Sequence, residues 1–128
     1  MTPSNRRIRV VVADDSVTAL AAICNYLRSE DVFEVVGTAH DGQQLIEKVR
    51  QLLPELVLTD LSMPRMNGLE ATAELRKLFP ELRIILITQL SGLSLRDECL
   101  RQGADGFTEK CQIPEKLMEE VSRLFPES

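Results

Sequence analysis

Residues 8–15 read IRVVVADD, a short and almost continuous apolar run that is followed at once by two acids. β-Branched residues dominate the run, which is typical of a strand buried on both faces of a parallel sheet. After the acids, apolar residues recur at helical spacing, namely Val17, Leu20, Ala21, Cys24 and Leu27. This part of the chain therefore predicts a strand, a turn and a helix.

The same unit recurs four more times along the chain. Further predicted strands cover residues 33–39, 56–59, 84–87 and 104–108, and each is followed by an apolar stripe of helical period. The helices are predicted to end near Leu53, before Pro80, near Gln102 and near Phe125. Each crossover has to return the chain to the same end of the sheet. The pattern therefore predicts an α/β, doubly wound (βα)5 domain with a five-stranded parallel sheet flanked by helices.

Length and charge limit the classes of function. The chain has 128 residues, the size of one domain, and we expect a single domain over residues 1–128. Acidic residues outnumber basic ones by 20 to 15, and the net charge of −5 argues against direct binding of nucleic acid. No apolar run approaches the roughly 18 residues of a membrane span. The three cysteines form no C-x-x-C pair. We therefore expect a cytoplasmic protein that does not associate with membranes.

Polar residues follow four of the five predicted strands. Asp14 and Asp15 follow the first strand, Asp60 the third and Thr88 the fourth, and Lys110 lies just past the fifth. Parallel strands end at one edge of a sheet, so these side chains should converge there. Taken singly, each fits a helix cap, a turn residue or a solvated charge.

Taken together, the acids indicate a cation. Three carboxylates at one edge raise one another's pKa unless a cation lies among them, and Mg²⁺ suits oxygen ligands. Such a site supports phosphoryl transfer, in which a carboxylate can be the nucleophile. Asp60 is the best candidate because the third strand is central, while Thr88 can donate a hydrogen bond and Lys110 can complement the remaining charge.

These residues resemble the receiver domains of two-component response regulators, which share the fold of the chemotaxis regulators. The resemblance extends from Ile8 to Phe125 and includes VADD (12–15), DLSMP (60–64), MNG (66–68), Thr88, and GADGF (103–107) leading to Lys110. It implies the flavodoxin-like strand order 2-1-3-4-5. Residues 67–72, NGLEAT, are closest to the nitrate and nitrogen-fixation regulators, whose members usually carry a DNA-binding domain and regulate transcription. We expect no such effector domain in this chain.

The resemblance also implies roles for individual residues. Asp60 would accept a phosphoryl group from a sensor histidine kinase or from a phosphotransfer protein of a phosphorelay. Mg²⁺ would be held by Asp14, Asp15, Asp60 and the backbone carbonyl of Ser62, and Lys110 would pair with the phosphoryl group. Thr88 and Phe107 match the switch pair of the family. The readout would be the face formed by the fourth helix, fifth strand and fifth helix, used by an output protein or in a homodimer.

Two residues depart from the family pattern. Cys111 follows the lysine where many members have proline, and Gln89 stands where a small residue is usual. The resemblance implies that Ser62 and Leu90 occupy positions that tune dephosphorylation, and that Gln89 occupies a tuning position that affects access of donors and water to Asp60.

Other classes of function remain as alternatives. A Mg²⁺-dependent aspartyl-phosphate hydrolase of the haloacid dehalogenase type needs a second aspartate two residues after the nucleophile, where this chain has Ser62. A nucleotide- or flavin-binding module needs a glycine- or hydroxyl-rich loop after the first strand, where Asp14 and Asp15 would repel phosphate. A docking domain of the same fold that is never phosphorylated would not need these acids together with Lys110.

Overall fold

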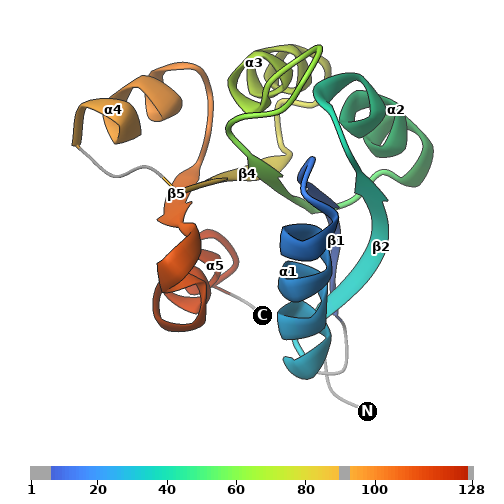
Figure 1. The fold of residues 1–128 in the computed structure, drawn as a ribbon, viewed down its shortest axis with the longest axis vertical. Helices are drawn as coiled ribbons and strands as arrows, with labels where there is room; N and C mark the ends of the chain where they lie inside the picture. Colours follow the sequence, from blue (N-terminus) through green and yellow to red (C-terminus); the bar gives the residue numbers. More distant parts are fainter. Residues whose placement is uncertain (1–6, 90–92, 127–128) are drawn as a thin grey trace.

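The structure is a computed structural model that describes residues 7–89 and 93–126. Strands and helices alternate along the chain (Figure 1). The strands are β1 (Ile8–Ala13), β2 (Phe33–Ala39), β3 (Leu56–Asp60), β4 (Arg83–Thr88) and β5 (Gly106–Glu109). The helices are α1 (Val17–Ser29), α2 (Gly42–Leu52), α3 (Gly68–Leu78), α4 (Leu93–Arg101) and α5 (Met118–Leu124). All strand pairs are parallel, and the order β2-β1-β3-β4-β5 confirms the predicted fold and topology.

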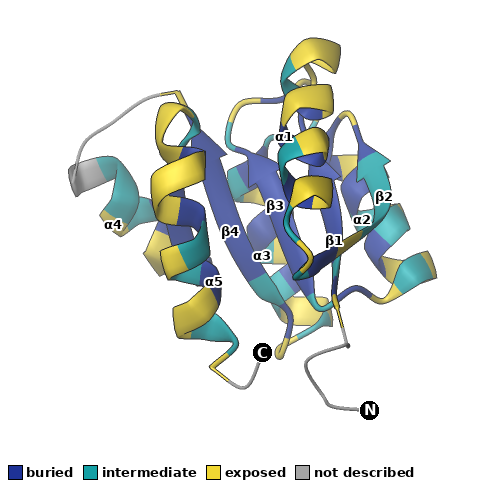
Figure 2. Ribbon diagram, turned by 90° about the horizontal axis from the view of Figure 1, so that it is seen from below, coloured by how far each residue is buried: buried dark blue, intermediate teal, exposed yellow. Residues whose placement is uncertain are grey.

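The sheet separates two layers of helices. α1 and α5 cover one face, and α2, α3 and α4 cover the other (Figure 1). Alternate residues of β1 serve the two layers, since Val10 and Val12 pack under α1 whereas Val11 and Ala13 pack under α2. The central strands are therefore buried on both sides, while each helix turns only one stripe inward (Figure 2). This arrangement explains why the strands are nearly continuous apolar runs.

The burial of individual helix residues departs in places from the apolar pattern of the sequence. Val17 and Ala21 are exposed in α1, because the buried stripe runs through Leu20, Ile23, Cys24 and Leu27 and these two residues lie to one side of it. Leu53 is also exposed, since it follows α2 in a left-handed conformation that ends the helix before Pro54.

The end of the chain departs from a plain strand and helix. Residues 104 and 105 precede β5, whose pairing with β4 begins at Gly106. The N–H of Ala104 donates to the carbonyl of Cys99 at the end of α4, and the N–H of Asp105 donates to the carbonyl of Ile84 on β4. A 3₁₀ turn at Lys110–Gln112 (η2) and a π-helical turn at Ile113–Leu117 (η3) then lead into α5. In the described residues, no helix has the length and apolar character needed to span a membrane.

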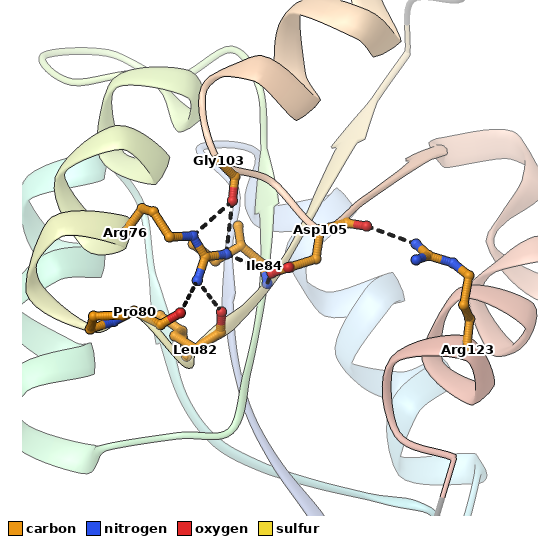
Figure 3. A network of polar contacts seen from close by, with 7 residues as sticks. All are labelled: Arg76, Pro80, Leu82, Ile84, Gly103, Asp105 and Arg123. Atoms are coloured by element: carbon orange, nitrogen blue, oxygen red, sulfur yellow. Dashed lines mark hydrogen bonds and ion pairs between the residues drawn. The ribbon is translucent and has the colours of Figure 1, made fainter.

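A network around Arg76 joins four parts of the fold at the amino ends of the strands (Figure 3). The guanidinium group donates to the carboxylate of Asp105, 2.6 Å away. It also donates to the backbone carbonyls of Pro80, Leu82 and Gly103. Asp105 accepts in turn from the backbone N–H of Ile84, and its carbonyl accepts from Arg123 on α5. The network therefore ties α3, β4, the turn before β5 and α5 together.

We expect Arg76→Ala to lower the free energy of unfolding by about 2 kcal/mol. A hydrogen bond to a charged group contributes roughly 1.5–3 kcal/mol, and the contributions of several bonds made by one side chain do not add in full. Urea denaturation measures this change. Lys77→Ala is the matched control, since Lys77 is exposed and its loss should cost less than about 0.5 kcal/mol. Equal effects of the two substitutions would show that the network adds no stability.

Candidate functional site

The carboxyl ends of the strands bring the predicted site residues to one edge of the sheet. Asp14 directly follows β1, Asp60 ends β3, Thr88 ends β4, and Lys110 opens the turn after β5. A cavity of about 360 Å³ lies at this edge, lined by Asp15, Asp60, Leu61, Ser62, Thr88, Gln89 and Lys110. One carboxylate oxygen from each of Asp14, Asp15 and Asp60 lies within 4.8 Å of the others.

Lys110 is the cation that faces these acids. Its Nζ lies 2.8 Å from Oδ2 of Asp14 and 3.4 Å from Oδ2 of Asp60. The side chain of Asp14 is fully buried, and its Oδ1 accepts a hydrogen bond from the backbone N–H of Ser16 at 2.9 Å. Lys110 contacts two of the three clustered carboxylates, and three acids with one ammonium group leave a formal excess of two negative charges.

Burial and neighbouring charges shift the pKa values of Asp60 and Lys110. Burial raises the pKa of Asp60, and the neighbouring charge of Asp14 raises it further, although Lys110 acts in the opposite direction. Burial alone would lower the pKa of Lys110, but its hydrogen bond to Asp14 and the charges of Asp60 and Asp14 outweigh burial and hold it above its ordinary value. A bound cation would remove the unfavourable charge at Asp60.

The donor set fits a hard divalent cation. Asp14, Asp15 and Asp60 offer only carboxylate oxygens, which suit Mg²⁺ better than soft metals. Asp14 and Asp60 are buried whereas Asp15 is exposed, so the cluster opens to solvent on one side. An acidic cluster of this kind is typical of a magnesium site.

The loop after β3 is shaped by a glycine. A Cβ atom on Gly68 would lie 2.1 Å from the carbonyl oxygen of Asp60, so only glycine permits this approach. The N–H of Gly68 donates to the carbonyl of Leu61, and Asn67 and Glu70 cap the start of α3 reciprocally. The MNG motif therefore closes the loop that carries Ser62 past the phosphoacceptor candidate.

The remaining predicted residues lie around this centre. Thr88 is buried and Gln89 is exposed, and both line the cavity beside Asp60. The ring of Phe107 is already buried, with 9% exposed, and packs against Leu86, Cys99 and Ala104. Cys111 is a free, exposed thiol. Leu90 lies outside the described residues.

One contact near the site was missed by the sequence analysis. Asp41, before α2, forms an ion pair with Arg65 in the loop after β3. The two residues are 24 positions apart and lie on connections of non-adjacent strands, so no local pattern pairs them.

We expect Asp60→Asn to raise the free energy of unfolding of the metal-free protein at neutral pH by roughly 1 kcal/mol. Point mutations commonly change this free energy by a similar amount, but most of them lower it. Because the folded pKa of Asp60 is raised, the cost of its charge appears as pH rises through that pKa and vanishes below the ordinary aspartate value of about 4. Urea denaturation at several pH values measures the difference, with Asp31→Asn, an exposed acid, as control. A destabilised Asp60→Asn protein would contradict the charge argument.

Comparison with known proteins agrees with this geometry. Residues 10–122 match the response regulator receiver domain family. The chain is 39% identical over 113 residues to a protein-glutamate methylesterase/protein-glutamine glutaminase of Clostridium acetobutylicum, covering 87% of this chain and 33% of that protein. It is 28% identical to the chemotaxis protein CheY of Thermotoga maritima, covering 91% of this chain and 96% of that protein. CheY is short, whereas most of the other curated relatives are longer proteins, and the chain spans about a third to about half of their length.

Solved structures show the same fold. The receiver domain of the NarL regulator from Mycobacterium tuberculosis superposes with a TM-score of 0.87 at 28% identity, covering 96% of this chain and 99% of that one. CheY in the CheX–CheY–BeF3–Mg²⁺ complex from Borrelia burgdorferi gives a TM-score of 0.85 at 27% identity, covering 92% and 89%. The chain therefore belongs to the response regulator receiver domain family and is a phosphoaccepting signalling switch of two-component systems.

Proposed function

We propose that Asp60 is the phosphoacceptor and that a histidine kinase or a histidine phosphotransfer protein is the donor. The observation that carries the proposal is the position of the Asp60 carboxylate, which ends the central strand and lines the open cavity between the other acids and Lys110. The proposal covers a single receiver domain over residues 1–128.

In the proposed reaction, a carboxylate oxygen of Asp60 attacks the phosphorus of the donor phosphohistidine. A P–O bond forms, the P–N bond of the donor breaks, and the leaving imidazole takes the electron pair and a proton. Hydrolysis of the resulting acyl phosphate releases inorganic phosphate and restores the Asp60 carboxylate. Little other covalent chemistry is needed, so alignment and charge neutralisation carry the catalysis.

The proposed metal ligands are the carboxylates of Asp14, Asp15 and Asp60 and the backbone carbonyl of Ser62. Mg²⁺, when bound, would neutralise charge on the acids and on the phosphoryl oxygens. Asp14 keeps its orientation through the N–H of Ser16, and Lys110 is held between Asp14 and Asp60, where its ammonium group can pair with the incoming phosphoryl group. The BeF3–Mg²⁺ complex of the related CheY supports this assignment by analogy.

The proposed switch combines several contacts. Shifting a two-state equilibrium from 1:99 to 99:1 requires about 5.5 kcal/mol. A hydrogen bond from the Thr88 hydroxyl to a charged phosphoryl oxygen would supply roughly 1.5–3 kcal/mol, so Lys110 and the metal have to contribute as well. The ring of Phe107 is already buried. An inward turn of this ring would therefore contribute less free energy to the switch than the burial of an exposed ring.

The proposed output surface is the α4–β5–α5 face, which binds an output protein or a second receiver. A cavity of about 420 Å³ on this face is lined by two basic, three acidic and three uncharged side chains: Arg96 and Lys116; Glu109, Glu119 and Glu120; and Phe107, Thr108 and Gln112. Control of transcription would require a DNA-binding partner or domain. A cytoplasmic location belongs to the same proposal and is supported by three unpaired cysteines, which suit a reducing compartment.

We expect a small phosphoryl donor, such as acetyl phosphate with Mg²⁺, to add one phosphoryl group to the wild-type chain. Intact-mass and peptide mass spectrometry measure the amount and the position of the modification. Beryllofluoride with Mg²⁺ should shift the NMR signals around the cavity in wild type and leave Asp60→Asn unchanged. A modification at another residue, or identical responses of the two proteins, would refute the assignment.

We expect Gln89→Ala to accelerate both phosphorylation by acetyl phosphate and dephosphorylation several-fold, because the longer side chain lines the cavity beside Asp60 and narrows access for donor and water. Time courses by intact-mass spectrometry give both rates. The matched control is Gln43→Ala, which shortens an exposed glutamine on α2. If both variants react at the wild-type rates, Gln89 does not restrict access.

A further inference from the structure

The loop between β3 and α3 is fastened to the start of α2, which lies beside α3 on the same face of the sheet (Figure 1). The N–H of Gly42 donates to the carbonyl of Met66 at 2.8 Å. A Cβ atom on Gly42 would lie 2.4 Å from that carbonyl oxygen and within 3 Å of the Met66 side chain, so the loop packs directly against the glycine. The loop therefore has a fixed support on its side remote from β3.

An ion pair reinforces this support. Nη1 of Arg65 in the loop donates to Oδ2 of Asp41 at 2.9 Å. The Asp41 side chain is only 4% exposed, and its other oxygen accepts from the N–H of Gln44 as the N-cap of α2. Both oxygens of this buried carboxylate are thus used, one by the helix and one by the loop.

The backbone at Arg65 has an unusual conformation. Arg65 has a φ of +65°, a conformation that is unfavourable for a residue with a side chain and ordinary for glycine. Its side chain is 69% exposed, so packing does not hold it there. The N–H of Met66 donates to the carbonyl of Pro64 across Arg65 at 2.7 Å, and the ion pair with Asp41 is a second contact that holds this turn.

The position of this loop matters for the metal. Ser62, at the other end of the loop, is tied to Asp60 only by a long hydrogen bond of 3.4 Å from its N–H to Oδ1. The preceding residue, Leu61, is fixed more firmly, since its N–H donates to the carbonyl of Ile87 and its carbonyl accepts from the N–H of Gly68. The attachments at Arg65 and Met66 limit movement of the loop from its other end. Groups that orient metal ligands from outside the coordination shell commonly change metal affinity by about tenfold or more.

We propose that Arg65 and Asp41 are positioning residues that hold the Ser62 backbone in place for Mg²⁺ binding. This inference rests on the proposed function, because it assumes that Mg²⁺ binds among Asp14, Asp15, Asp60 and the Ser62 carbonyl. Neither Arg65 nor Asp41 touches the cation or the phosphoryl group.

The test compares Mg²⁺ dissociation constants of the unphosphorylated protein by isothermal titration calorimetry. Asp41→Asn removes a negative charge but keeps a good N-cap, whereas Arg65→Gln removes a positive charge. Long-range electrostatics alone would weaken binding in the first variant and strengthen it in the second. Positioning predicts that both variants bind Mg²⁺ about five- to tenfold more weakly. It also predicts that the double variant is no worse than either single one and that Arg65→Lys recovers part of the affinity.

The control is Arg50→Gln, which removes the charge of an exposed arginine on α2 and should not weaken Mg²⁺ binding. Urea denaturation in the absence of metal establishes that each variant is folded. Unchanged or tighter Mg²⁺ binding by Arg65→Gln, or additive losses in the double variant, would overturn the inference. Failure of the wild-type chain itself to bind Mg²⁺ or to become phosphorylated on Asp60 would instead overturn the proposed function.

Discussion

The mutual repulsion of three carboxylates at one edge of a parallel sheet is the constraint on which the site depends. The strands of the core place Asp14, Asp15 and Asp60 close together, and Lys110 offsets only part of their charge. The fold tolerates this arrangement because the apolar strands beneath are buried on both faces. Their burial stabilises the fold and offsets the free energy that the clustered acids lose. A site with excess negative charge is in turn ready to take up a cation and, with it, a phosphoryl group.

The two edges of the sheet have different tasks. At the amino edge, Arg76 and Asp105 join helices and strands in a network that favours a rigid frame. At the carboxyl edge, Asp60 ends β3 and Ser62 lies in the loop that follows, which is attached to α2 through Arg65 and Met66. A rigid frame is suited to a switch, because local changes at the site can shift the equilibrium without unfolding the core.

Much of the fold and of the site composition was predictable from the sequence. Five apolar runs alternating with helical stripes determine the layers, and the rule that parallel strands end at one edge predicts which polar residues meet. Pairings across the chain were not predictable, because the Asp41–Arg65 ion pair and the Arg76 carbonyl contacts depend on how distant connections pack. The burial of Phe107 also depends on tertiary packing, since its partners Leu86 and Cys99 lie on other elements.

The most direct measurement of the central claim is a crystal structure of the chain grown with Mn²⁺, which can replace Mg²⁺ at oxygen sites and is located by its anomalous scattering. The account predicts one ion among the oxygens of Asp14, Asp15 and Asp60, with the ammonium group of Lys110 still beside Asp60. An anomalous map with no ion between these carboxylates, or with the ion bound at another cluster, would contradict it.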